Sequence, residues 1–152
     1  MNSRYVFLDF DGVIVTSSSY KRVKDWEGAG SALIEPRLVA NVQTLCEKSG
    51  ARVVISSAWR LVYAPDYLNE MLRDAGLRVD VAGQTPRVGH RGEEIRRWCQ
   101  LYNAAEEDIV ILEDEEDVSP FRHRQVRTTF TGTRCGFTER HLSRALRLWG
   151  LS

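Results

Sequence analysis

Apolar runs alternate along this chain with segments in which apolar residues recur at helical spacing. The runs are rich in β-favouring residues and predict five buried strands, at residues 4–8, 52–56, 77–82, 109–112 and 126–130. The helical patterns predict four helices, at residues 36–50, 66–75, 92–102 and 138–149. Strands and helices that alternate in this order predict an α/β fold: a Rossmann-like parallel sheet with helices on both faces.

Residues 13–35 do not fit this alternation. They contain two clusters of residues that favour turns, at 16–19 and 28–31. We interpret the segment as a short hairpin or flap, with Tyr20 and Trp26 near the mouth of a site. No linker or repeat divides the rest, so residues 1–152 are expected to form one domain with a minimal cap or none.

Three of the predicted strands end in polar residues. Asp9 and Asp11 follow the first strand, Ser56 ends the second, and Glu113 with Asp114 follows the fourth. Ligands of parallel α/β sheets bind at the carboxyl ends of the strands. The sequence therefore predicts a site at this edge of the sheet.

Asp9 and Asp11 are two positions apart, so an extended chain points both carboxylates to one side. Gly12 follows them and permits a sharp turn. Paired carboxylates at the end of a rigid strand suit a divalent cation such as Mg²⁺, which prefers oxygen ligands.

The composition is typical of a globular protein, and the balanced charge gives no overall electrostatic attraction to a nucleic acid. The formal net charge is zero, but eighteen of the 21 basic residues are arginine, which suits phosphate contacts. Residues 106–117 hold eight acids, whereas residues 122–147 hold seven arginines and two histidines against one acid. This basic segment could follow a polyanion or form a solvated helix surface.

Cys46, Cys99 and Cys135 are odd in number and widely spaced, which matches neither a disulfide framework nor a zinc site. No apolar run approaches the ~20 residues of a membrane-spanning helix, and the N-terminus does not resemble a signal peptide. We expect a cytoplasmic protein with no membrane partner.

The segment Asp9-Phe10-Asp11-Gly12-Val13 resembles the first motif, DxDG[TV], of the haloacid dehalogenase-like (HAD) phosphohydrolases. Residues 53–57 resemble the second motif, an apolar strand that ends in a phosphate-binding hydroxyl. Ser56 is the better match and Ser57 the alternate. The following Trp59-Arg60 completes an SSxWR pattern similar to a subgroup linked to nucleic-acid end repair, in which Arg60 would bind a phosphate. Trp59 could stack on a base or pack in the core.

The two remaining motifs of the family have matches as well. Arg91 resembles the basic residue that neutralises the transferred phosphoryl group, a position at which the family more often has Lys; Arg87 and His90 are competing candidates. Residues 111–117 resemble the acidic pair that closes the metal site. The usual pair is Asp-Asp, and here it is Glu113-Asp114. We assign the metal to Asp114, with Glu113 as a supporting or weaker ligand and Asp117 in reserve.

This resemblance implies a Mg²⁺-dependent phosphatase. Asp9 would attack phosphorus and form an aspartyl-phosphate, and Asp11 would act as general acid and then general base. Mg²⁺ would bind Asp9, the backbone carbonyl of Asp11, and Asp114.

An uncapped site is open, which suits a large phosphorylated substrate such as a nucleic-acid end, or a nucleotide, with Arg60, Arg87 and Ser57 as substrate contacts. A phosphatase of small metabolites and a non-catalytic phosphate- or protein-binding module are the alternatives. The oligomeric state stays open.

Overall fold

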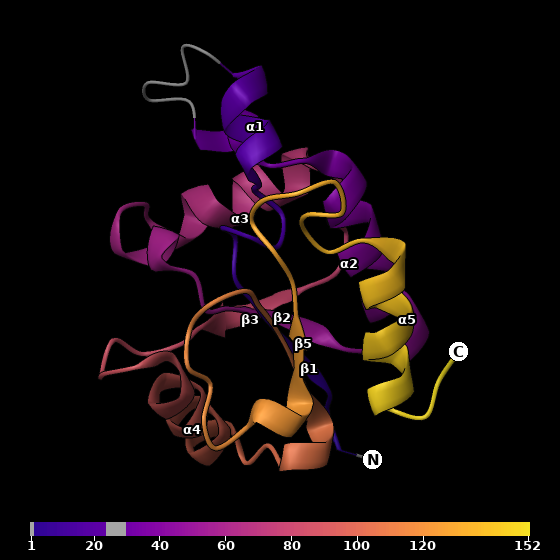
Figure 1. The fold of residues 1–152 in the computed structure, drawn as a ribbon. Helices are drawn as coiled ribbons and strands as arrows, with labels where there is room; N and C mark the ends of the chain where they lie inside the picture. Colours follow the sequence, from indigo (N-terminus) through magenta and orange to yellow (C-terminus); the bar gives the residue numbers. More distant parts are fainter. Residues whose placement is uncertain (1, 24–29) are drawn as a thin grey trace.

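The computed structural model describes residues 2–23 and 30–152. Five parallel strands form one sheet in the order β3-β2-β1-β4-β5 (Figure 1). The strands are β1 (Tyr5–Leu8), β2 (Arg52–Ile55), β3 (Val81–Gln84), β4 (Ile109–Glu113) and β5 (Gln125–Arg127). The predicted α/β fold with a parallel sheet is confirmed. Because β1 lies between β2 and β4, it is at the centre of the sheet.

Helices cover both faces of this sheet, as predicted. They are α1 (Ser17–Arg22), α2 (Pro36–Ser49), α3 (Pro65–Asp74), α4 (Arg91–Tyr102) and α5 (Glu139–Leu148). Short 3-10 helices lie at η1 (Gly30–Leu33), η2 (Ala58–Leu61), η3 (Glu106–Asp108) and η4 (Arg122–Arg124). Among the described residues, no helix is both long and apolar enough to cross a bilayer.

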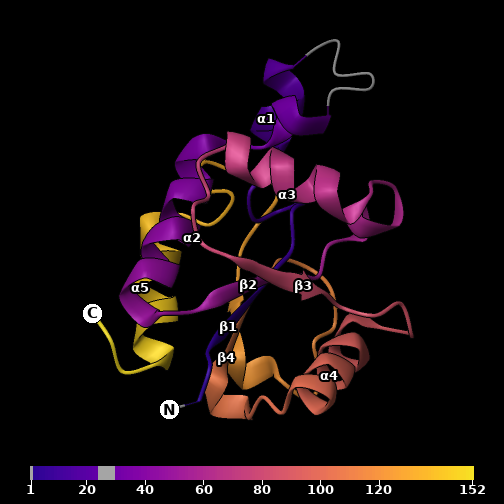
Figure 2. The same cartoon turned by 180° about the vertical axis from the view of Figure 1, so that it is seen from behind.

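Alternate residues of the strands pack against different helices. In β1, Val6 and Leu8 join a core with residues of α2, α3 and α5, whereas Phe7 faces Ile95 and Trp98 of α4. Figure 2 shows the sheet between α4 on one side and α2 with α5 on the other. This alternation follows from the period of two along a strand, and burial on both faces explains the continuous apolar runs.

Two strands differ from their predicted bounds. The third was predicted at residues 77–82, but β3 begins at Val81 and extends to Gln84. Leu77 instead closes α3, because its N–H donates to the carbonyl of Leu72 at 3.0 Å. The half-exposed edge position of β3 accounts for the error, since an edge strand need not be continuously apolar. The fifth strand is limited to residues 125–127.

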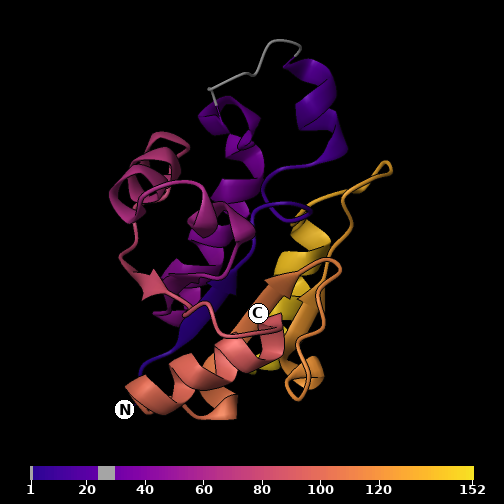
Figure 3. The same ribbon diagram turned by 90° about the vertical axis from the view of Figure 1, so that its left-hand side faces the viewer.

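The segment 13–35 was predicted to be a hairpin or flap, and its described part adds no strand to the sheet. It forms α1 and η1, and α1 projects beyond the carboxyl ends of the strands (Figures 1 and 3). The turn-like residues 16–19 begin α1, where the Thr16 N–H donates to the Ser19 hydroxyl at 3.0 Å. The hydroxyls of Thr16 and Ser19 also donate to the buried carboxylate of Glu35. Trp26, expected near the site, lies outside the described residues.

Candidate active site

Asp9, Ser56 and Glu113 lie side by side at the carboxyl edge of the three central strands. The Asp9 N–H donates to the carbonyl of Leu112, and the Ser56 N–H donates to that of Leu8, so the strand register continues through these residues. Leu8 and Leu112 pack on the α2–α5 face, so Asp9 and Glu113 are directed to the α4 face. The polar residues that end these three strands therefore meet at one edge of the sheet, as the sequence predicts.

The carboxylates of Asp9, Glu113 and Asp114 form a cluster in which one oxygen from each lies within 4.8 Å of the others. Gly12 makes room for it. The backbone of Gly12 has a φ of +86°, and a Cβ at this position would lie 2.2 Å from Oδ2 of Asp114. Glycine thus serves both the turn and the approach of Asp114 to the first-strand loop. Asp117, the reserve ligand, is exposed and bonded to Ser119, outside this cluster.

Arg91, the first residue of α4, supplies positive charge to this cluster. Its side chain is buried; one terminal nitrogen contacts Oε1 of Glu113 and lies 3.8 Å from Oδ1 of Asp9. Its Nε lies 3.7 Å from Glu94, one turn further along the helix. The competing candidates Arg87 and His90 are exposed in the loop before α4. The structure thus brings Arg91, of these three, into contact with the carboxylates.

Burial is the main cause of unusual protonation in the cluster. It raises the pKa of Asp9 to about 6, although Arg91 opposes the change. Burial and then the negative charge of Asp9 raise the pKa of Glu113 to about 8. Burial and the neighbouring Glu113 raise the pKa of Asp114 to about 7. Three crowded carboxylates facing a single arginine are a donor set that fits a hard divalent cation, which would favour their ionised forms.

Ser56 has a buried hydroxyl without a partner among the described residues; the residue is 1% exposed. An unsatisfied buried hydroxyl is costly unless a ligand or water completes it. The alternate residue, Ser57, differs, because its hydroxyl accepts the Trp59 N–H at 3.1 Å and begins η2. The available hydroxyl is therefore that of Ser56.

Asp11 lies outside the carboxylate cluster and is held by two aromatic side chains. Trp59 Nε1 donates to its Oδ2 at 2.9 Å, and the Tyr20 hydroxyl donates to its Oδ1 at 3.5 Å. Trp59 itself is 8% exposed and packs against Phe10 and Tyr63. Of the two roles considered for Trp59, the structure supports packing over base stacking, and adds a hydrogen bond that sequence patterns did not indicate.

Arg60, which was expected to contact a phosphate, is engaged by neighbouring groups of the protein. Its guanidinium donates to the carbonyls of Ser57, Thr85 and Pro86 and forms a salt bridge of 2.7 Å with Glu94. With its donors engaged in this way, Arg60 connects the loop after β3 to α4, and its assignment as a direct phosphate contact stays a prediction. Glu94, which also contacts Arg91, was missed because an acid in the first turn of a helix is ordinary.

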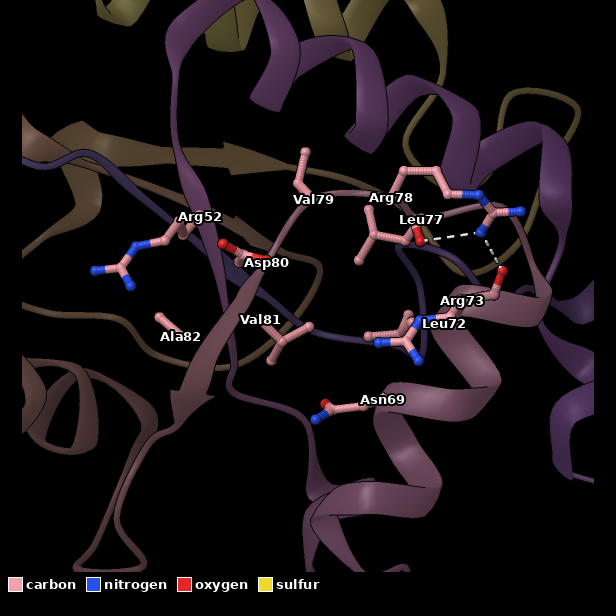
Figure 4. Close-up of a pocket in the computed structure, with 10 residues that line it drawn as sticks. All are labelled: Arg52, Asn69, Leu72, Arg73, Leu77, Arg78, Val79, Asp80, Val81 and Ala82. Atoms are coloured by element: carbon pink, nitrogen blue, oxygen red, sulfur yellow. Dashed lines mark hydrogen bonds between the residues drawn. The ribbon is translucent and has the colours of Figure 1, made fainter.

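A separate pocket of about 450 Å³ opens at the other end of the sheet (Figure 4). It is lined by the first residues of β2 and β3, Arg52 and Val81, and by Arg73 of α3. Arg78 beside it donates to the carbonyls of Arg73 and Leu77. Because these residues lie at the amino ends of the strands, the pocket is no part of the Asp9 site.

A family model described as the HAD domain in Swiss Army Knife RNA repair proteins matches residues 5–142, a range that includes every strand and site residue described above. Comparisons with curated proteins and with solved structures found no match. HAD proteins are generally hydrolases that use Mg²⁺, and a HAD domain of RNA repair proteins suggests phosphatase-type function on nucleic-acid ends. The chain belongs to the family of HAD domains found in Swiss Army Knife RNA repair proteins.

Proposed function

We propose that this protein is a Mg²⁺-dependent phosphomonoesterase that removes the terminal phosphate of an RNA end through an aspartyl-phosphate on Asp9. The observation that carries the proposal is the cluster of Asp9, Glu113 and Asp114 facing Arg91, beside the unpartnered hydroxyl of Ser56. In this proposal the nucleophile, the cation ligands, the hydroxyl that donates to the phosphate and the balancing positive charge all come from one edge of the sheet. These are the parts that phosphoryl transfer requires.

Asp9, Asp114 and the backbone carbonyl of Asp11 would hold the cation, with Glu113 as a further carboxylate close by. Bound Mg²⁺ supplies charge that offsets the negative phosphoryl oxygens. The buried carboxylates support this assignment, because without such a charge their pKa values are raised and their ionised forms are disfavoured.

The protein's own groups divide the remaining work. An Asp9 carboxylate oxygen bonds to phosphorus while the bond from phosphorus to the leaving oxygen breaks, and Asp11 gives its proton to that oxygen. Asp11 then takes a proton from the water that attacks the aspartyl-phosphate, which regenerates Asp9 and releases phosphate. The Ser56 hydroxyl and Arg91 bind the non-bridging oxygens during both steps.

An RNA end is the substrate class that the family supports. Helix α1 projects beyond the carboxyl ends of the strands (Figure 1), and the described residues contain no inserted cap domain, which supports access of a long nucleic-acid strand to the site. Arg87 is the exposed cation in the loop that leads into Arg91. We assign the contact with the strand's phosphates to Arg87, since Arg60 is engaged elsewhere.

The nucleophile is tested with Asp9→Asn. This variant should abolish Mg²⁺-dependent hydrolysis of p-nitrophenyl phosphate and of a phosphorylated oligonucleotide while it keeps the fold. Asp117→Asn is the matched control, because Asp117 is an exposed acid outside the cluster and the change should leave turnover nearly intact. Substantial turnover by Asp9→Asn would remove Asp9 as nucleophile.

The substrate class is tested by binding of phosphorylated RNA oligonucleotides to the Asp9→Asn form. We expect affinity that falls with added salt, since phosphate contacts release counterions. Arg87→Ala should weaken this binding, whereas Arg73→Ala, at the remote pocket, should not (Figure 4). Equal affinity for oligonucleotide and mononucleotide would instead indicate a nucleotide or small-metabolite phosphatase.

A further inference from the structure

Two donors from different parts of the fold converge on the Asp11 carboxyl. Trp59 belongs to η2, after the second strand, and Tyr20 belongs to α1, in the segment after the first. Each bonds a different oxygen, the indole N–H to Oδ2 at 2.9 Å and the hydroxyl to Oδ1 at 3.5 Å. A carboxyl group bonded at both oxygens has a restricted side-chain orientation.

The indole of Trp59 is itself fixed in place. Its ring centroid lies 5.2 Å from that of Phe10 and 5.6 Å from that of Tyr63. Its backbone N–H donates to the Ser57 hydroxyl at 3.1 Å, which sets the start of η2. The donor that reaches Asp11 is therefore mounted on a buried, packed side chain rather than on a mobile one.

We propose that Trp59 is a positioning residue that holds the Asp11 carboxyl in the orientation for proton transfer to the leaving group, with Tyr20 as its second support. This inference rests on the proposed function, in which Asp11 is the general acid. An indole N–H can only donate, so Oδ2 serves as its acceptor, and Oδ1 is left to carry the transferable proton. The Tyr20 hydroxyl donates to Oδ1, and Oδ1 keeps a lone pair whether or not it carries the transferable proton, so this bond can persist before and after the proton moves.

This role predicts a dependence on the leaving group. When the bond to phosphorus breaks, a ribose oxygen must receive a proton from Asp11 to leave as a neutral alcohol. A dinitrophenolate leaves as a stable anion and needs no proton. Misorienting the acid should therefore slow hydrolysis of an RNA terminal phosphate much more than hydrolysis of 2,4-dinitrophenyl phosphate.

The test is Trp59→Phe, which keeps an aromatic ring against Phe10 and removes the N–H. We expect kcat on a phosphorylated oligonucleotide to fall about 10- to 100-fold, and kcat on 2,4-dinitrophenyl phosphate to fall less than about 3-fold. Tyr20→Phe should show the same selectivity with a smaller loss, because its hydrogen bond is longer. Thermal unfolding of each variant monitors the fold.

Trp98→Phe is the matched control. Trp98 is also buried, but it packs beside Tyr5 and Phe7 on the α4 face, and its indole N–H has no partner among the described residues. This variant reports the structural cost of replacing a buried tryptophan, so its effect on the two substrates should be equal.

The outcomes separate the inference from the function on which it rests. Asp11→Asn must itself show the selective loss on the oligonucleotide; if it does not, Asp11 is not the general acid and the proposed mechanism fails. If Asp11→Asn is selective but Trp59→Phe slows both substrates equally, Trp59 only packs in the core and the inference is overturned.

Discussion

Replacing Gly12 by alanine tests whether the proposed metal site depends on the approach of Asp114 to the first-strand loop. A Cβ at residue 12 would lie 2.2 Å from Oδ2 of Asp114, and within 2.6 Å of two other atoms of that side chain. Ordinary van der Waals contact begins at 3.4 Å. Either the carboxylate or the loop that carries Asp9 and Asp11 must therefore move by about 1 Å, which is the scale at which misplaced catalytic groups lose function.

The free-energy cost of Gly12→Ala has two parts. The backbone at this position has a φ of +86°, which an alanine adopts at a cost of about 1–2 kcal/mol. The forced displacement of Asp114 adds to this and separates carboxylates that now lie within 4.8 Å. We expect a loss of about 100-fold in kcat/KM, together with loss of the thermal stabilisation by Mg²⁺ that the proposed function predicts for the unaltered protein.

Gly50→Ala is the matched control for this experiment. Gly50 ends α2 with a φ of +76°, and a Cβ there would meet nothing within 4 Å. It should therefore lose a similar amount of stability from backbone strain while keeping its activity and its response to Mg²⁺. Activity of Gly12→Ala within about 3-fold of Gly50→Ala, a difference of about 0.6 kcal/mol, would refute the structural role of Gly12.

Two predictions concern pH. The raised pKa values of Asp9, Asp114 and Glu113, from about 6 to about 8, mean that protons compete with Mg²⁺, so calorimetry should show affinity that rises from pH 6 to 8 with proton release on binding. Because these folded-state pKa values exceed the ordinary values of 3.8 for Asp and 4.5 for Glu, the metal-free protein should lose stability as pH rises from about 4 to about 8; a flat profile would contradict the burial argument. Burial and then Arg144 and Arg140 lower the pKa of His141, whose Nδ1 accepts the Thr138 N–H. The stability contributed by neutral His141 should thus be lost as pH falls below 6.5, and urea unfolding should show a smaller acid loss in His141→Gln than in the unaltered protein.

The fold was largely predictable because parallel strands that are buried on both faces appear in the sequence as continuous apolar runs. β1, β2 and β4 are continuous apolar runs at the centre of the sheet, and each was predicted within one residue of its bounds. The edge strand β3 was misplaced, since Gly83 and Gln84 at its end do not resemble a buried strand. Apolar pattern thus locates a strand well only where both faces are covered.

The same distinction applies to the candidate site. The meeting of Asp9, Ser56 and Glu113 could be predicted, because it follows from strand ends sharing one edge of a parallel sheet. The partners of Arg60 and Trp59 could not. These partners depend on which side chains lie in the neighbouring loops and helices, and no periodicity in the sequence indicates them.

Two departures from the family pattern lie at opposite ends of one interaction. The family that the sequence resembles more often has Lys at the position of Arg91, and it usually has Asp at the position of Glu113. In the structure these two side chains form a buried pair, and Arg91 also reaches toward Asp9 and Glu94. A planar guanidinium can bond several carboxylates from a fixed position, whereas an ammonium is a single point charge. The longer Glu113 side chain brings its carboxylate to Arg91 and leaves Asp114, the next residue, beside Gly12. The two substitutions therefore fit each other, and together they preserve a positive group at the carboxylates without displacing the acid that we assign to the cation.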